Sequence, residues 1–226
     1  MSSPSSTSLP EKPPVSLTDI ARFPLVSFLP DIQSPELDLG LGLNHTDKQW
    51  CFAAEIVSID SSEPYHTILE VRDRIGKQVR VVFICPLESF PKHRLETGQV
   101  ILILRAVTQA ILKDGKKGVL VQDAAKVKVL PFELNTLIKV NEHASFYNKA
   151  HKEGKLCHGC MQPKERLRAC PECHFYYSCS ADCAKKGFNS KHHDLACLIL
   201  RDKDVAALLA GSFDDLEVFS SFSLIL

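Results

Sequence analysis

Cysteine placement is the feature of this 226-residue sequence that most limits its possible folds, because seven of the nine cysteines lie between residues 157 and 197. Together with one histidine they form four closely spaced pairs: Cys157 and Cys160, Cys170 and Cys173, Cys179 and Cys183, and His193 and Cys197. Two intervening residues place both thiols on one tight turn, whereas three place both side chains on one face of a helix. Each pair can therefore direct two ligand atoms toward a single metal ion.

The number of ligands predicts how many ions this segment holds. Structural zinc takes four sulfur or nitrogen ligands, so seven cysteines and one histidine complete two sites with none left over. A closed site has no open position for water or substrate and cannot activate a nucleophile as catalytic zinc does. We therefore expect two Zn²⁺ ions, no catalytic residues and no enzymatic activity.

Disulfides are the competing explanation for so many cysteines, and the N-terminal sequence argues against them. Residues 1–8 read MSSPSSTS, without the charged start and apolar run of a secretory signal. The sequence also lacks the stretch of about 18 apolar residues that spans a bilayer. We expect an intracellular protein, cytoplasmic or nuclear, with no membrane partner, and disulfides are rare in those compartments.

The cysteine-rich segment resembles the MYND family of zinc fingers at all eight ligand positions. The motifs that carry the resemblance are Cys157-His-Gly-Cys160, Leu167-Arg-Ala-Cys170-Pro-Glu-Cys173, Tyr177-Ser-Cys179-Ser-Ala-Asp-Cys183 and His193-Asp-Leu-Ala-Cys197. The resemblance covers 41 of 226 residues and implies a treble-type finger with interleaved sites. It assigns the first zinc to Cys157, Cys160, Cys179 and Cys183, and the second to Cys170, Cys173, His193 and Cys197. Spacing alone leaves sequential sites open as the alternative: 157/160/170/173 and 179/183/193/197.

The second half of this segment departs from the family pattern. Phe188 stands where the family usually has a tryptophan, and the interval from Phe188 to the histidine is longer than usual. The longer interval makes His192 a rival to His193, but His193 is preferred because it lies one helical turn before Cys197. Two other histidines are expected at the surface and outside the metal sites: His158 and His174.

Residues 46–133 show the alternation of apolar and polar side chains that is typical of β-strands. Five strands are predicted, at 50–60, 67–73, 78–84, 99–107 and 119–122, the last continued by 126–130, with a partly helical link at 86–95. A closed barrel buries five antiparallel strands without open edges. The predicted fold class is therefore α+β, with a small antiparallel β-barrel that resembles an OB-fold followed by the finger. A small β-sandwich is the alternative. Two isolated cysteines are expected to be buried core thiols: Cys51 and Cys85.

Three further segments flank the predicted barrel and the finger (157–197). Residues 1–45 form a Ser- and Pro-rich lead-in that is expected to be disordered. Four of its apolar residues are candidates for partial docking: Phe23, Leu25, Phe28 and Leu29. Residues 134–156 are expected to be a linker, helical over Asn135–Asn148. Residues 198–226 are expected to form one amphipathic helix that ends at Gly211, and an apolar tail to which no role is assigned.

A closed, metal-stabilised finger leaves recognition as its expected role. MYND fingers dock short proline-containing peptides, so the resemblance implies an adaptor between proteins, with transcriptional regulation as one setting. The expected groove lies near Tyr176, Tyr177 and the segment Cys179–Cys183, because aromatic side chains suit proline rings. The expected partner is a protein or a proline-containing peptide. The sequence equally allows the barrel to be the part that binds the partner protein.

Single-stranded nucleic acid, bound through the OB-like barrel, is the alternative partner. Basic residues gather at two predicted turns: Arg72, Arg74, Lys77 and Arg80, and Lys113, Lys116 and Lys117. Tyr65 and Phe83 are candidates for stacking on bases. Acidic residues interleave with these basic ones, and the formal net charge of the chain is zero. Because nucleic-acid binding usually needs a basic surface, this partner is the less expected of the two.

Overall fold

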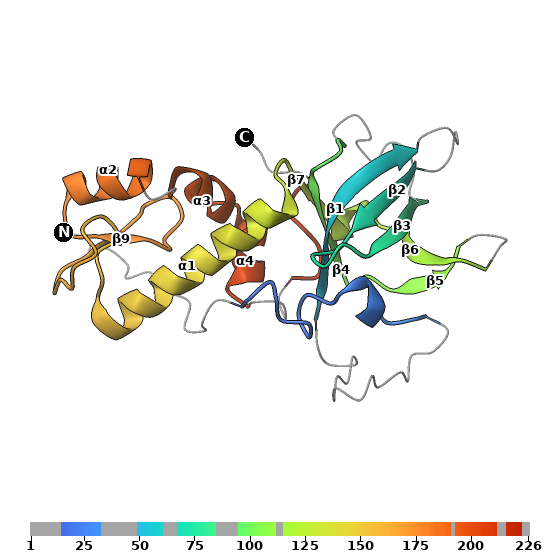
Figure 1. Ribbon diagram of the computed structural model, residues 1–226, viewed down its shortest axis with the longest axis horizontal. Coiled ribbons are helices and arrows are strands. Elements are labelled where there is room, and N and C mark those ends of the chain that lie inside the picture. The colour runs from blue at the N-terminus through green and yellow to red at the C-terminus, as the bar shows by residue number, and fades with distance from the viewer. Residues whose placement is uncertain are drawn as a thin grey trace, which may run out of the picture.

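The computed structural model describes residues 15–32, 49–60, 67–84, 95–111, 115–190, 193–211 and 216–222. Within these residues the chain forms a seven-stranded sheet, a two-stranded hairpin and four α-helices, so the expected α+β class is confirmed. The large sheet lies at one end of the molecule and the cysteine-rich hairpin at the other, with the long helix α1 between them (Figure 1). Several parts of the prediction lie outside the described residues: residues 1–14 and 33–45 of the lead-in, Tyr65, Cys85, residues 86–94 of the link, Lys113, His192, and residues 212–215 and 223–226 of the C-terminal segment.

The large sheet has the strand order β5-β6-β3-β2-β1-β4-β7. Its strands are β1 (Cys51–Asp60), β2 (Thr67–Arg72), β3 (Gln78–Phe83), β4 (Val100–Leu104), β5 (Thr108–Ala110), β6 (Lys117–Val121) and β7 (Val127–Leu130). All neighbours are antiparallel except β3 and β6, which are parallel. The prediction of a closed antiparallel barrel is therefore wrong, because the described ladder is open, with β5 and β7 at its two edges.

Two local breaks explain why the predicted strands differ from the observed ones. The predicted strand 99–107 ends early because Arg105 has a φ of 53°, after which β5 pairs with β6 instead of extending β4. The predicted continuation at 126–130 leaves β6 because a 3-10 turn, η4 (Ala124–Lys126), intervenes. The Asp123 side chain caps that turn by accepting a hydrogen bond from the Ala125 N–H, and β7 then pairs with β4.

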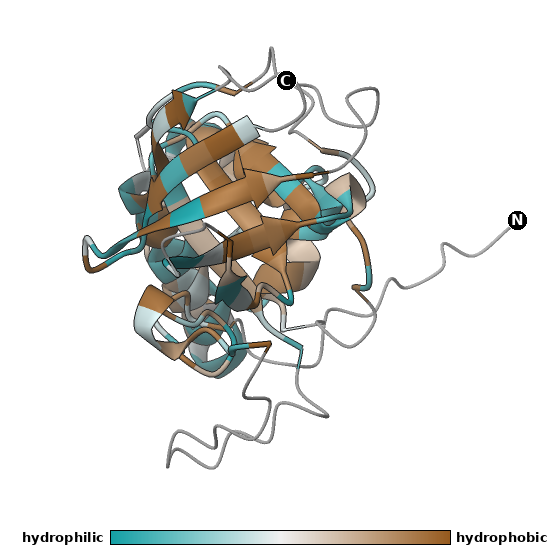
Figure 2. Cartoon of the chain, turned by 90° about the vertical axis from the view of Figure 1, so that its right-hand side faces the viewer, coloured by the Kyte–Doolittle hydropathy of each residue, from teal (hydrophilic) through white to brown (hydrophobic). Residues whose placement is uncertain are grey.

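The strand β4 is apolar at every position because both of its faces are covered. Its sequence is Val100-Ile101-Leu102-Ile103-Leu104, and all five residues are buried. Val100, Leu102 and Leu104 belong to one core, and Ile101 and Ile103 to a second, as the two-residue period of a strand requires. The second core is formed by side chains from every strand of the sheet except β5. Figure 2 shows the hydrophobic character of these strands.

Residues 15–32 pack on the sheet, so this part of the lead-in is not disordered, and three of the four candidates for docking are buried as expected. Phe23 is only 1% exposed, Leu25 and Leu29 are buried, and a 3-10 turn, η1 (Val26–Phe28), separates them. Side chains hold this backbone: Arg74 donates to the Phe23 carbonyl (2.7 Å), and the Asp73 carboxylate accepts from the Val26 N–H. The segment has no regular ladder and therefore no periodic pattern that sequence analysis can detect.

Segments from both ends of the described chain cover the two edges of the sheet. At β5, the Ile32 N–H donates to the Thr108 carbonyl, and the Thr108 N–H donates to the Pro30 carbonyl. At β7, the Val129 N–H donates to the Phe222 carbonyl at 2.7 Å. Paired edges are protected from association with the strands of other molecules.

A single helix, α1 (Leu134–Gly154), replaces the expected linker. Its first free N–H, that of Leu134, donates to the Glu55 carboxylate of β1 at 3.1 Å. The buried residues of α1 recur at helical spacing: Leu137, Val140, Ala144 and Tyr147. They belong to the same core as Val100, Leu102 and Leu104 of β4, and this core also contains residues of the finger. The sheet and the finger therefore share one hydrophobic core.

Two helices, α3 (His193–Leu200) and α4 (Lys203–Leu209), take the place of the single predicted C-terminal helix. The break lies at Asp202, whose side chain caps α4 by accepting hydrogen bonds from the Asp204 and Val205 N–H groups. Gly211, the predicted stop, follows the end of α4 with a φ of +77°.

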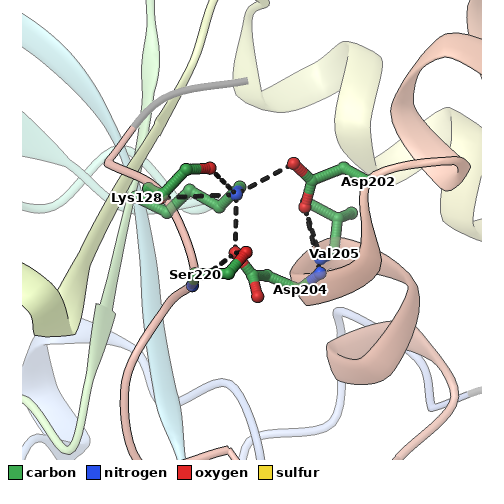
Figure 3. A network of polar contacts seen from close by, with 6 residues as sticks. Lys128, Asp202, Asp204, Val205 and Ser220 are labelled. Carbon is green, nitrogen blue, oxygen red and sulfur yellow. Dashed lines mark hydrogen bonds and ion pairs between the residues drawn. The ribbon is translucent and has the colours of Figure 1, made fainter. Parts of the chain in front are cut away.

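A buried lysine ties α4 and the C-terminal segment to the sheet (Figure 3). Lys128 of β7 is 0% exposed, and its Nζ lies 2.7 Å from the Asp204 carboxylate and 2.9 Å from that of Asp202. Lys128 also donates to the Ser221 hydroxyl at 3.0 Å. The Asp204 carboxylate accepts from both the N–H and the hydroxyl of Ser220. One buried cation thus pairs with two carboxylates.

Candidate metal centres

The first cluster joins the turn at Cys157 and Cys160 to Cys179 and Cys183. Cys179 follows the short strand β9 (Tyr177–Ser178), and Cys183 lies in the first turn of α2 (Ala181–Ser190), where the Ser180 hydroxyl accepts from the Cys183 N–H. The Sγ–Sγ distances are 4.0 Å for Cys160–Cys179 and 3.6 Å for Cys179–Cys183. Tetrahedral zinc with bonds of about 2.3 Å holds its sulfurs about 3.8 Å apart, so this cluster has the dimensions of a Cys₄ site.

The second cluster contains three cysteines and one histidine: Cys170, Cys173, His193 and Cys197. Cys170 follows β8 (Arg168–Ala169), and its Sγ lies 3.8 Å from that of Cys197. The Nε2 of His193 lies 3.3 Å from the Sγ of Cys173. His193 is the first residue of α3 and Cys197 lies one turn later, so both side chains leave the same face of that helix.

The two clusters alternate along the chain, as the MYND resemblance implies, and the sequential grouping is not the one observed. In each cluster all four ligand atoms lie within 4.8 Å of one another, so each can hold a metal ion. The β8–β9 hairpin connects them, since the Cys170 N–H donates to the Tyr176 carbonyl and the His158 N–H to that of Tyr177. Two ions in this arrangement would cross-link a segment that is too short to form a core of its own.

The pKa values of three of these ligand residues bear on metal binding. Burial lowers the pKa of His193 to about 4, so its imidazole is neutral at pH 7, which is the form that binds metals. Burial raises the pKa of the Cys157 thiol, but hydrogen bonds from the Cys160 and Cys179 backbones outweigh this effect and lower the pKa to about 6. Burial raises the pKa of Cys173, so a bound cation is needed to keep that sulfur as a thiolate.

An aromatic cluster of Tyr147, His158 and Tyr176 lies next to the metal sites and was not predicted from the sequence. His158 is 3% exposed and not a surface residue as expected, because its ring packs on Tyr147 of α1 (centroids 4.2 Å apart) and on Tyr176 (4.6 Å). His174 is exposed. Neither histidine belongs to a metal cluster. No motif marks His158 as buried, since the ring closest to it, that of Tyr147, belongs to a helix outside the finger.

The glycine of α2 that faces this aromatic cluster provides a first test of the packing. A Cβ on Gly187 would lie 2.4 Å from the His158 Cδ2, so Gly187→Ala must displace the imidazole ring. We expect this variant to lose about 1–3 kcal/mol of unfolding free energy, measured by chemical denaturation. The matched control is Gly154→Ala, where a Cβ meets nothing within 4 Å. Equal stability of the two variants would contradict the described packing of His158.

A groove of about 370 Å³ lies beside both metal clusters. Its walls come from the segment around Pro171, from Tyr176 and Tyr177, and from Ala184 and Phe188 of α2. Phe188 is 43% exposed, and its ring lies 5.6 Å from that of His193. Two charged residues also border the groove: Glu172 and Lys185. The lining is thus mainly apolar and aromatic, with a mixed-charge rim.

Comparisons with known proteins do not assign the chain to a family. No family model and no curated protein sequence matches it. Among solved structures, one similar chain comes from the crystal structure of the S. pombe Stn1-ten1 complex, with 22% sequence identity and a TM-score of 0.29. The match covers 37% of this chain and 58% of the Stn1-ten1 chain, which is less than two thirds of the length of the latter. A likeness this weak carries no inference about fold or partners. None of the described helices is long and apolar enough to cross a membrane.

Proposed function

We propose that this chain is a two-zinc, MYND-type adaptor whose finger docks a short proline-containing peptide of another protein. The observation that carries the proposal is the apolar and aromatic groove that borders both metal clusters. Proline rings suit such a surface, and their fixed backbone geometry lowers the entropy lost on binding. Each cluster supplies four protein ligands, which leaves no coordination position for a substrate and supports recognition over catalysis.

The basic residues of the first hairpin favour a protein partner over nucleic acid. Arg72 forms an ion pair with Glu55, and Arg80 lies 3.9 Å from Glu70. Arg74 donates to backbone carbonyls of the segment 15–32, as described above. These cations are engaged within the molecule, so they do not form the open basic surface that the phosphates of single-stranded nucleic acid require.

The proposal predicts micromolar binding of a proline-containing peptide that depends on Phe188. Isothermal titration of the full chain, with peptides selected from a proline-rich display library, should give a dissociation constant near 1 µM, about −8 kcal/mol. Phe188→Ala removes an exposed ring of the groove wall and should weaken binding at least tenfold without a large loss of stability.

The matched control for Phe188→Ala is Ile75→Ala, which removes an exposed apolar side chain (66%) at the β2–β3 turn. This variant should bind the peptide as the unmodified chain does. The proposal fails if a peptide whose prolines are replaced by alanine binds with unchanged affinity. It also fails if Phe188→Ala leaves the affinity for the original peptide unchanged. A salt-sensitive gel shift with a single-stranded oligonucleotide, together with no peptide binding, would favour the alternative partner.

A further inference from the structure

The imidazole of His193, the nitrogen ligand of the second cluster, is packed among three other rings. Its ring centroid lies 4.1 Å from that of Tyr176 and 5.6 Å from those of both His158 and Phe188. His193 is 6% exposed. The last torsion of a histidine side chain has only broad intrinsic preferences, so its surroundings decide where the ring nitrogens point. The rings around His193 therefore bear on how it meets a metal ion.

Tyr176 makes the closest of these three contacts and is itself firmly held. It is 2% exposed, its hydroxyl lies 3.5 Å from the Nδ1 of His143, and its ring centroid lies 5.6 Å from that of Tyr147. Both of these neighbours belong to α1, outside the finger. The Tyr176 carbonyl also accepts from the Cys170 N–H at 2.7 Å. One residue thus contacts two of the four ligand residues of the second cluster.

We propose that Tyr176 is a positioning residue for the second metal ion. Its ring, held against α1, keeps the His193 imidazole turned so that Nε2 faces the other ligands, where it lies 3.3 Å from the Cys173 Sγ. Tyr176 is not one of the four ligand residues and acts only through them. Groups that fix a ligating histidine in this way typically change metal affinity about 10- to 100-fold when they are removed.

Cadmium NMR of the full chain, loaded with Cd²⁺ in place of zinc, tests this role. The shielding of cadmium depends on its donor atoms, so the Cys₄ and Cys₃His clusters should give two separate resonances. In Tyr176→Leu, which removes the ring but keeps a buried apolar side chain, only the Cys₃His resonance should shift or broaden. The zinc affinity of that one site, measured by competition with the chelator pyridylazoresorcinol, should fall about tenfold.

Two further variants separate positioning from packing. Tyr176→Phe keeps the ring and should restore both the Cys₃His resonance and the zinc affinity of the unmodified chain. Phe175→Leu removes the neighbouring ring, which is also buried (7% exposed) in the shared core but has no ring contact with His193 among the described residues. This control should lose stability as Tyr176→Leu does, yet keep both resonances and both affinities.

Two results would overturn the proposal. The first is a Tyr176→Leu chain with an unchanged Cys₃His resonance and unchanged zinc affinity. The second is an equal effect of Phe175→Leu on that resonance, because this would reduce the role of Tyr176 to general core packing. Tyr176→Met, whose longer side chain fills more of the space, replaces Tyr176→Leu if the latter does not fold, with the same expectations. No measurement here uses a peptide, so the adaptor proposal fails or stands independently.

Discussion

Replacing Cys173 with serine should release one zinc ion and destabilise the whole chain, not only the finger. Cys173 is 3% exposed, lies against His193 in the second cluster, and belongs to the core that α1, α3 and the sheet share. A serine hydroxyl does not replace a thiolate at a structural zinc site. Because zinc binding supplies folding free energy in such segments, on the order of 10 kcal/mol, its loss should unfold the finger and expose one end of that core.

The measurement for Cys173→Ser is zinc per chain by elemental analysis, paired with thermal unfolding followed by circular dichroism. The matched control is Cys51→Ser, which makes the same chemical change at a fully buried thiol of the same core that belongs to no metal cluster. This control should lose stability by about 1–3 kcal/mol, through burial of a hydroxyl, but retain both ions. Full zinc content in Cys173→Ser, or zinc loss in Cys51→Ser, would show that the ligand assignment is wrong.

The second large effect is expected from Lys128→Met. The methionine has a similar length but no charge, so the carboxylates of Asp202 and Asp204 would remain in a buried region without their cation. Removing one partner of a buried ion pair costs about 3–5 kcal/mol, and we expect that loss in urea denaturation. The control is Lys203→Met, an exposed lysine beside the same carboxylates, which should change stability by less than about 0.5 kcal/mol. A loss below about 1 kcal/mol for Lys128→Met would contradict the network in Figure 3.

The same network predicts a loss of stability in acid. Burial raises the pKa of Asp204, but hydrogen bonds from Lys128 and Ser220 outweigh it, so the pKa lies below its ordinary value. The unfolded chain, in which this carboxyl titrates near 3.9, therefore takes up the proton first as pH falls. The stabilisation from Asp204 is complete above that value and disappears as pH drops through the folded pKa. The unfolding free energy of Asp204→Asn should consequently fall less steeply below about pH 4 than that of the unmodified chain.

Local patterns allowed the metal clusters and most strands to be predicted. The four ligand pairs could be found because the two members of each pair lie within five residues of one another, whereas the grouping of the pairs into two clusters was implied only by the family resemblance. The strands β1 to β4 could be found because their side chains alternate or are continuously apolar. Both signals depend only on residues that are close together in the sequence.

The features that were missed depend on contacts between distant segments. The open sheet results from the backbone at Arg105 and the turn capped by Asp123, neither of which interrupts the apolar pattern strongly. The helix α1 continues through a charged stretch that resembles a linker, because its apolar face packs on both the sheet and the finger. His158 is buried by Tyr147, a residue outside the finger motif. Long-range packing of this kind leaves no periodic signal in the sequence.

The central claim is that eight side chains hold two ions in interleaved, fully coordinated sites. Native mass spectrometry of the full chain tests it most directly, because the method counts the metals bound to each folded molecule. We expect a single folded species that carries two zinc ions. A folded chain with one zinc or none would contradict it.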